Sequence, residues 1–351
     1  MQRLTRWIGP IMAIAVVAVF VFVLPKIADY RTVWDIVTDI SAAWMIALLV
    51  AMVVYLACFA FPWMAAVPGL GFWRATVVTQ ASTAASAVLP GGDVLGMGTQ
   101  FAMLRGWGFG ADSASLAVLV TGVWNWLVRI AFPVFAIGLL ALEPGDVSSQ
   151  LRIAGWISAA LFVGVLGAFI GLLVSDRLAR RIGDIGAAAA MWLMRLIRRP
   201  RTFSWGDDAI RFRELSEGLV RRRWPHLTIA TAVGHLSGFV VLLFCLRAVG
   251  VDADVVSGVE CFAAFSVIRL LAAVPITPGG LGVVELGLTG IFVGLGGDQG
   301  AVVAAVLLFR ALTLVPVILL GVACFLLWRR TGPGAALETS DASGSPPARS
   351  S

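Results

Sequence analysis

The sequence predicts an all-α integral membrane protein, and three observations lead to this fold class. Hydrophobic residues make up 60% of the 351-residue chain and charged residues only 13%, which is far outside the composition of soluble globular proteins. Several apolar runs are longer than about 18 residues, enough to cross a hydrocarbon core of about 30 Å as helices. Two Pro-Gly-Gly motifs interrupt this apolar sequence, and each predicts the tip of a helical hairpin.

Six apolar runs are long enough to be full spans: residues 8–25, 43–66, 114–142, 151–174, 226–249 and 300–328. We expect the first run to be a retained span, because no small-residue cleavage site precedes Lys26. With the two hairpins, the chain would hold up to ten membrane helices in a single polytopic domain, residues 1–330. The tail, residues 331–351, is rich in Ala, Ser, Gly and Pro and is expected to be disordered.

Charge gives the expected orientation. The segment 175–225 contains twelve arginines and six acids, so the positive-inside rule places it, and with it both termini, on the cytoplasmic side of the cell (inner) membrane. From Leu178 to Leu196, apolar positions recur at helical spacing. This pattern predicts an amphipathic helix that lies on anionic lipid or packs against other cytoplasmic helices. The net charge of +6 therefore indicates the membrane surface as a partner, and no nucleic acid.

Counting spans from a cytoplasmic N-terminus leaves two segments, 67–112 and 250–299, that must start and finish on the same side. Each holds two shorter apolar pieces that meet at a Pro-Gly-Gly motif: 72–89 with 94–106 at LPGGD, and 257–275 with 279–296 at TPGG. The two hairpins should enter from opposite faces and bury their tips, because non-helical backbone in the membrane needs protein or water partners. The count leaves open whether each hairpin is re-entrant or fully spanning.

The hairpins belong to two similar parts of the chain, residues 67–142 and 250–328. In each, a Pro-Gly-Gly turn is followed by an acid and then by a span with an arginine and a proline shortly after it: RIAFP at 129–133 and RALTLVP at 310–316. The two arginine helices run in opposite directions by the span count, which predicts an inverted repeat. In transporters with such repeats, the substrate binds near the bilayer midplane where the repeats meet.

The candidate substrate-binding residues are the charged side chains and the turn residues of these two parts. An arginine at the centre of a span costs at least roughly 2.5–3.5 kcal/mol on insertion scales, so Arg129 and Arg310 should face the interior. Each either forms an ion pair that only positions a hairpin, or binds the phosphate of a lipid headgroup with its guanidinium fork. The full set is Arg310, Arg129, Glu285, Asp93, Gly279, Gly280, Gly91, Gly92, Pro278 and Arg269.

The acids and glycines of this set have alternatives of their own. Glu285 is either a proton carrier or a structural acid, and Asp93 either caps the arm after its turn or pairs with an arginine. The glycines would allow the backbone and its N–H groups to approach a phosphate closely. A Cβ atom should be obstructed at Gly279 and Gly280, so alanine at either should impair function more than a change at Gly321.

Other polar residues have more ordinary interpretations. The stretch TVVTQASTAAS, residues 76–86, either packs helices together or lines a polar path. His235 is either a hydrogen-bonded core histidine or a proton relay. The four cysteines lie in apolar runs without CxxC spacing and are expected to be small buried side chains. Neither histidine has a metal-binding partner nearby in sequence, so we expect no metal site and no cofactor.

The sequence PITPGGLGVVE, the earlier LPGGD segment and the downstream intramembrane arginine together resemble one known family. It is the flippase-like transmembrane domain of lysylphosphatidylglycerol synthases, and the resemblance covers about residues 8–328. In the two-part synthases this domain is thought to move a modified phospholipid between leaflets, while a cytosolic domain performs aminoacyl transfer. The present sequence ends after its last span, so the resemblance implies a stand-alone member without lysyl transfer.

The expected function is to bind a membrane phospholipid or another lipid with an anionic headgroup and to translocate it between leaflets. One alternative is a non-transporting partner that presents lipid to a membrane glycosyltransferase or lipid-modifying enzyme. Another is an ion-coupled transporter of small solutes. The chain has no GxSxG, HExxH or Walker motif, so we expect that it is not an enzyme.

Overall fold

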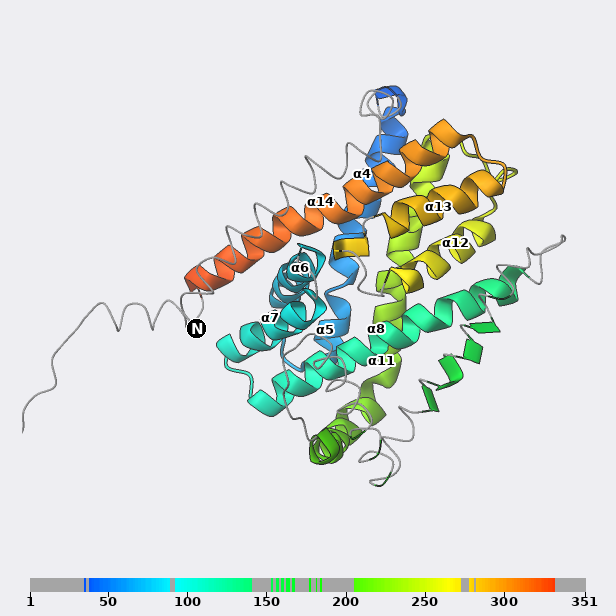
Figure 1. The fold of residues 1–351 in the computed structure, drawn as a ribbon. Coiled ribbons are helices and arrows are strands. Elements are labelled where there is room, and N and C mark those ends of the chain that lie inside the picture. Colours follow the sequence, from blue (N-terminus) through cyan, green and yellow to red (C-terminus); the bar gives the residue numbers. More distant parts are fainter. Residues whose placement is uncertain are drawn as a thin grey trace, which may run out of the picture.

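The computed structural model describes Asp35, scattered positions between 153 and 184, and residues 38–88, 92–140, 205–272, 278–280 and 282–331. Every element within these ranges is helical (Figure 1). The first apolar run, most of run 151–174, most of the proposed amphipathic helix and nearly all of the tail lie outside the described residues. The predictions for these segments therefore stay predictions.

Four helical segments are long and apolar enough to cross a membrane: Ala42–Ala66, Ala111–Leu140, Arg222–Ala248 and Gln299–Arg330. They correspond to four of the six predicted spans and confirm the all-α membrane fold. Their elements are α4 (Ala42–Cys58) with α5 (Phe61–Ala66), α8 (Ala111–Leu140), the second part of α11 (Trp205–Ala248) and α14 (Gln299–Thr331).

The span formed by α4 and α5 is broken in its second half. Pro62 lies in the first turn of α5 and has no backbone N–H to donate, so carbonyl groups near the break need other donors. Nε2 of Gln80 donates to the Leu56 carbonyl and Oγ1 of Thr79 donates to the Phe59 carbonyl, each at 3.1 Å. Side chains of the neighbouring helix thus satisfy the interrupted backbone, as the membrane interior requires.

Two hairpins of short helices lie between the long helices α8 and α14 (Figure 1). They are α6 (Phe72–Val88) with α7 (Gly92–Gly106), and α12 (Gly258–Leu271) with α13 (Val283–Gly294). These arms have 12 to 17 residues. At 1.5 Å per residue they are about 18 to 26 Å long, less than a hydrocarbon core of about 30 Å. The arm lengths therefore favour re-entrant hairpins.

The tip of the second hairpin contacts the end of the first arm of the other hairpin. Its turn forms a 3-10 helix, η2 (Pro278–Gly280), which packs against α6. A Cβ atom built on Gly279 would lie 3.2 Å from the carbonyl oxygen of Ala87, near the end of α6. Hairpins that enter from opposite faces would meet in this way. The first turn, residues 89–91, lies outside the described residues, and which face is cytoplasmic stays a prediction.

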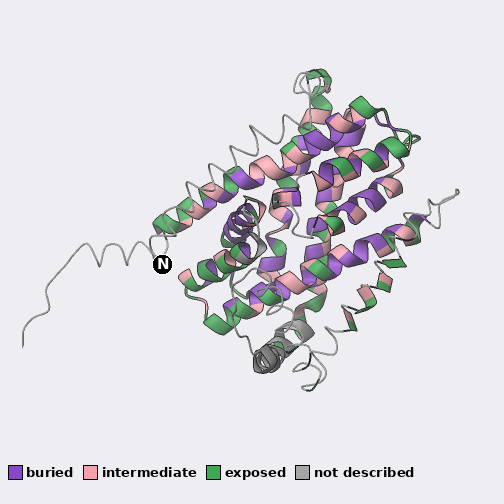
Figure 2. Ribbon diagram, viewed as in Figure 1, coloured by how far each residue is buried: buried purple, intermediate pink, exposed green. Residues whose placement is uncertain are grey.

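The long helices α8 and α14 run in opposite directions on two sides of the hairpins (Figure 1). Helix α8 contacts α7 and α12, whereas α14 contacts α6 and α13, so each long helix touches one arm of each hairpin. Helix α6 lies among α4, α5, α7, α14 and η2, and Figure 2 shows that most of it is buried. Three polar residues of α6, Thr79, Gln80 and Ser82, are buried inside the protein, where they need protein or ligand partners.

Helix α14 approaches α6 closely at Gly321. A Cβ atom there would clash with the side chain of Ala84 and the backbone carbonyl of Gln80. A side chain is therefore obstructed at Gly321 as well, and the expectation that alanine at Gly279 or Gly280 impairs function more than a change at Gly321 stays a prediction. The sequence shows only a glycine in an apolar span, whereas the backbone against which it packs belongs to a distant part of the chain.

Candidate functional site

Arg310 of α14 and Glu285 of α13 form a buried ion pair at the second hairpin. Nε of Arg310 lies 2.6 Å from Oε1 of Glu285, and the two side chains are 12% and 5% exposed. Nη2 of Arg310 also donates to the Gly279 carbonyl at 2.9 Å. The backbone N–H of Gly282 donates to the other carboxylate oxygen of Glu285 at 2.6 Å. The pair therefore joins α14 to the hairpin turn and to the start of α13.

Of the two interpretations left open for Arg310, the structure contains the ion pair. We call Arg310, Glu285 and the Gly279 carbonyl the hairpin clamp. Removing one member of such a pair leaves a buried charge without its partner and costs about 3–5 kcal/mol. The clamp thus has a structural role, and lipid binding by Arg310 stays a prediction.

The glycines of the second turn have backbone conformations that disfavour a side chain. Gly279 and Gly280 have φ angles of 60° and 66°, in the left-handed region that L-residues with a Cβ atom rarely adopt. A Cβ atom on Gly280 would also lie 3.0 Å from the Cβ atom of Ala272. The expectation that a side chain would be obstructed here is confirmed, whereas a phosphate-binding role for these glycines stays a prediction.

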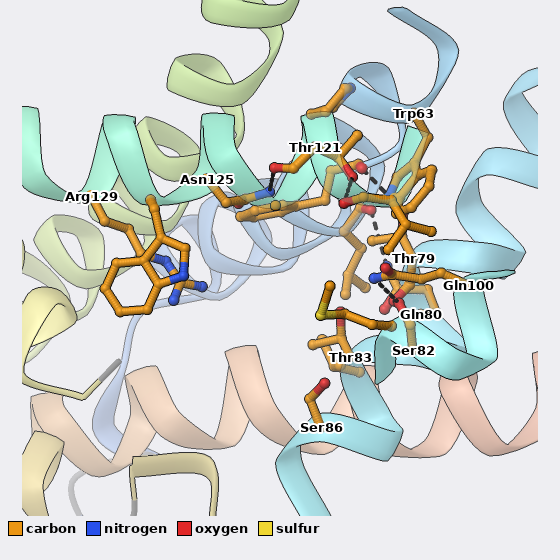
Figure 3. A pocket seen from close by; sticks show the side chains of 18 of the residues that line it. Trp63, Thr79, Gln80, Ser82, Thr83, Ser86, Gln100, Thr121, Asn125 and Arg129 are labelled. Atoms are coloured by element: carbon orange, nitrogen blue, oxygen red, sulfur yellow. Dashed lines mark hydrogen bonds between the residues drawn. The ribbon is translucent and has the colours of Figure 1, made fainter. Parts of the chain in front are cut away.

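A cavity of about 300 Å³ lies among α4, α5, α6, α7, α8, α12 and α14. Its wall contains Arg129 and amide and hydroxyl side chains from α6, α7 and α8 (Figure 3), and Arg269 of α12 lines it as well. The polar and charged lining residues are Thr79, Gln80, Ser82, Thr83, Ser86, Gln100, Thr121, Asn125, Arg129 and Arg269. A cavity of this size, within helices that cross a membrane, can hold a small polar group such as a headgroup.

The two arginines reach this cavity from different parts of the chain. Arg129 comes from α8 and Arg269 from α12, and an apolar cluster that includes Phe132 and Phe262 packs these two helices together. The guanidinium group of Arg269 lies 5.8 Å from the ring centre of Phe265. Its Nε is buried and has no hydrogen-bond partner among the described residues. Two guanidinium groups beside one cavity favour an anionic ligand.

Helix α6 forms the amide and hydroxyl part of the wall. Nε2 of Gln100, from α7, donates to Oγ of Ser82 at 3.1 Å. Gln80 is only 2% exposed, and its Oε1 has no hydrogen-bond partner in the described part of the chain. Both interpretations of the stretch 76–86 therefore hold: some of its polar groups join helices, and others line a polar cavity.

Asn125 of α8 is held in the cavity wall by two hydrogen bonds. Its Nδ2 donates to the Thr121 carbonyl at 2.8 Å, and its Oδ1 lies 3.1 Å from Nε2 of His235 in α11. His235 is 2% exposed and lies within electrostatic range of both cavity arginines. The arrangement is that of a hydrogen-bonded core histidine, which was one of its two interpretations.

One edge of the cavity reaches the surface of the bundle. Met97 of α7 and Trp126 of α8 line the cavity and are also 40% and 44% exposed, and Thr83 of α6 is exposed as well. Trp126 lies near the middle of α8, a membrane-crossing helix. The described cavity lining therefore includes side chains exposed at the surface of the helices, near the middle of a segment long and apolar enough to cross a membrane.

The structure divides the predicted site residues into two groups. Arg129 and Arg269 share the cavity, whereas Arg310, Glu285 and the glycines of the second turn belong to the hairpin clamp region and are not among the described lining residues. Gly92 begins α7. The side chains of Asp93 and Pro278, and the whole of Gly91, lie outside the described residues, so their proposed roles are untested.

Sequence reasoning did not single out Gln100, Gly122 or Asn125 as lining residues. A signal for Asn125 was present in the sequence. Thr121, Asn125 and Arg129 follow one another at intervals of four residues in α8, which places them on one face of a helix. A polar stripe on an otherwise apolar span indicates a face turned away from lipid.

The described residues include no group of three or more His, Cys, Asp or Glu side chains that could hold a metal ion. All four cysteines are free and buried, as expected for small apolar side chains.

The family model for the lysylphosphatidylglycerol synthase TM region matches residues 11–321. The chain belongs to this family. The match includes both hairpins, the hairpin clamp and every lining residue of the cavity, and it confirms the resemblance based on the Pro-Gly-Gly motifs. No curated protein and no solved structure matches the chain.

Proposed function

We propose that this family member binds the anionic headgroup of a membrane lipid in the cavity and moves the lipid between leaflets. The observation that carries the proposal is that Arg129 and Arg269 both line one polar cavity among helices long and apolar enough to cross a membrane. Charged groups at this depth are costly, so their retention indicates a function. The planar guanidinium group matches the oxygen geometry of a phosphate.

The exposed lining residues of α7 and α8 support a lipid over a small solute. A lipid headgroup can occupy the polar cavity while its acyl chains remain in the hydrocarbon core, beside the exposed apolar side chains Met97 and Trp126. Such an arrangement leaves the acyl chains in an apolar environment throughout, so they are never exposed to water. We propose binding and transport without an enzymatic step, cofactor or metal.

The hairpin clamp supports this function indirectly. Arg269 lies in α12, and α12 packs against α13, which Glu285 ties to α14. The clamp therefore holds the hairpin that carries one of the two cavity arginines. We propose that the clamp positions Arg269 beside the cavity. We also propose that both termini lie on the cytoplasmic side of the membrane.

Reconstitution into liposomes with headgroup-labelled phosphatidylglycerol tests the proposal. A membrane-impermeant reagent quenches label in the outer leaflet only, so wild-type protein should raise the quenched fraction above that of empty liposomes. Gly122→Phe should abolish the increase, because Gly122 lines the cavity and has open space at its Cβ position. Gly138→Phe is the matched control, since Gly138 lies on the same helix, is exposed and does not line the cavity.

The alternatives give different results in the same system. A protein that binds labelled lipid but never changes its leaflet would be a lipid-presenting partner of a lipid-modifying enzyme. A protein that neither binds nor moves lipid but takes up a soluble substrate would be a solute transporter. Equal activity of the Gly122→Phe and Gly138→Phe variants would contradict the cavity as the site of movement.

A further inference from the structure

We infer that a monovalent metal ion, such as Na⁺ or K⁺, binds beside the break between α4 and α5 and is carried together with the lipid. The ion is a transported solute and not a resident metal cofactor. Its binding is argued from oxygen atoms at the break, whereas its coupling to lipid movement rests on the proposed function. These oxygen atoms come from two places, the end of α4 and the polar side chains of α6.

The end of α4 provides backbone carbonyl oxygens inside a membrane-crossing segment. Helix α4 ends at Cys58, and Pro62 lies in the first turn of α5. The last carbonyls of a helix have no donor within the helix and lie at the negative end of its dipole. Leu56 and Phe59, at this end, both line the cavity. In transporters, carbonyls at such breaks coordinate the coupling ion, so the end of α4 suits a cation.

The side chains of α6 at this break leave several oxygen atoms able to accept. Nε2 of Gln80 donates to the Leu56 carbonyl at 3.1 Å, which orients the amide. Its Oε1 is buried and has no partner in the described part of the chain. Oγ1 of Thr79 lies 2.8 Å from the Ala75 carbonyl and 3.1 Å from the Phe59 carbonyl, so both share its single hydrogen. A positive ion would satisfy the buried acceptors that remain.

The chemistry of these ligands favours a singly charged ion. The described lining residues of the cavity include no Asp or Glu. Ca²⁺ and Mg²⁺ sites in proteins are usually built with carboxylates, which offset the double charge. The break offers carbonyl, amide and hydroxyl oxygens, which are neutral ligands. A water molecule could also donate to Oε1 of Gln80, but the negative end of the α4 dipole favours positive charge over a neutral donor.

The break lies apart from one of the cavity arginines. Figure 3 shows Thr79 and Gln80 on one side of the cavity and Arg129 on the other. An anionic group held by Arg129 and Arg269 would therefore share the cavity with the ion and attract it, strongly so where water is excluded. Each ligand then raises the affinity for the other by the same factor. This coupling would let an ion gradient drive lipid movement.

Thermal unfolding of the full-length protein in detergent, without added lipid, tests the ion site. The salt is NaCl, KCl or choline chloride at one constant ionic strength. An ion that binds only the folded state should raise the unfolding temperature by a few degrees, and the rise should saturate with ion concentration. We expect this in NaCl or KCl and not in choline chloride, whose cation is too large for the break. Equal unfolding temperatures in the three salts would overturn the inference.

Two variants remove single ligands of the proposed site. Thr79→Val removes the hydroxyl and Gln80→Leu removes the amide, so each should abolish the difference between metal-ion salt and choline salt. Thr79→Ser keeps the hydroxyl and should keep the difference. The comparison is made between salts within each variant, so a change in basal stability does not enter it. A full ion response in both Thr79→Val and Gln80→Leu would place the ion elsewhere and contradict the assignment.

Thr313→Val is the matched control for the loss of a buried hydroxyl. Thr313 is 9% exposed, donates to the Phe309 carbonyl one turn earlier in α14 at 2.7 Å, and is not among the described lining residues. Its variant should keep the ion response of the wild type. If Thr313→Val loses the response as Thr79→Val does, the effect reflects general packing and the site at the break is rejected.

The coupling is tested with the labelled liposomes. Phosphatidylglycerol should bind about fivefold more tightly in the effective metal-ion salt than in choline chloride, and its movement should be faster there. If the ion raises the unfolding temperature while lipid binding and movement are equal in all salts, the coupling is wrong. If no lipid moves in any salt while the ion response persists, the proposed function fails and the ion site stands.

Discussion

Arg310 and Arg129 occupy similar places in the two similar parts of the sequence, yet their surroundings differ. Arg310 is enclosed by protein: Glu285 and the Gly279 carbonyl accept its hydrogen bonds, and its side chain is 12% exposed. Arg129 lines a polar cavity that it shares with Arg269. Two similar parts of the sequence can therefore place their arginines in different surroundings: one joins a hairpin to a neighbouring helix and the other lines a cavity.

The difference follows from what packs beside each helix. At Arg310, α14 lies against the second hairpin turn and against the first turn of α13, where an acid is available. At Arg129, α8 lies beside α12, and Arg269 of α12 lines the same cavity. The ion pair of Arg310 is therefore part of a packed contact between helices, whereas Arg129 borders an open space.

The largest expected effect comes from breaking the ion pair between Arg310 and Glu285. Arg310→Leu leaves the buried carboxylate of Glu285 without its ion-pair partner, so the folded state should lose about 3–5 kcal/mol. The double variant Arg310→Leu with Glu285→Leu should lose much less, because no charge is stranded. Thermal unfolding of the purified proteins in detergent measures both. A single variant that is as stable as the double variant would show that the clamp does not stabilise the hairpin.

The second turn offers a pair of glycines that separates backbone strain from steric contact. Gly280→Ala should destabilise the protein by about 1–3 kcal/mol, because φ is 66° and the new Cβ atom would press on Ala272. Gly282→Ala is the control, with φ of 83° but nothing within 4 Å of its Cβ position. Gly282→Ala should lose less stability than Gly280→Ala in the same unfolding measurement. If Gly282→Ala loses more, the tight contact at Gly280 contributes little to the cost of a side chain.

Arg269→Gln tests whether an arginine that lines the cavity contributes to lipid binding. This change should weaken binding of phosphatidylglycerol about tenfold, which corresponds to one charge-assisted hydrogen bond. The thermal stability should change little, because its Nε has no hydrogen-bond partner among the described residues. Lipid titration and thermal unfolding of one protein sample give the two values. A large loss of stability with unchanged binding would place Arg269 with the structural residues.

The smallest expected effect concerns the cavity wall. Gly122→Ala should keep lipid movement near the wild-type level, because its Cβ atom would meet nothing within 4 Å. It should also raise stability by up to about 1 kcal/mol, the difference in helix propensity between the two residues. The liposome assay and thermal unfolding measure these quantities. Loss of movement from a single methyl group would mean that the ligand fits the wall at Gly122 more tightly than the open cavity indicates.

Much of the fold was predictable because a membrane helix is specified by its own composition and length. The predicted arms 72–89 and 94–106 correspond to α6 and α7, and four predicted spans correspond to the four long apolar segments. The break between α4 and α5 was not predicted, although Pro62 lies beside it. A proline can break a membrane helix when other groups donate hydrogen bonds to the carbonyls near the break. Here the donors are side chains of α6, a helix that the sequence of α4 and α5 does not specify.

Composition, apolar run length and the Pro-Gly-Gly breakers were enough to predict a membrane protein with two hairpins and to single out its intramembrane arginines. These are local properties of the chain. They could not tell that Arg310 contacts Glu285 and the Gly279 carbonyl together, or that Arg129 and Arg269 line one cavity, because these arrangements depend on how α8, α12, α13 and α14 pack. Nor could they show that Gln80 and Gln100 share a cavity with Arg269. Contacts between residues far apart in sequence depend on helix packing, which the periodicity of a single segment does not specify.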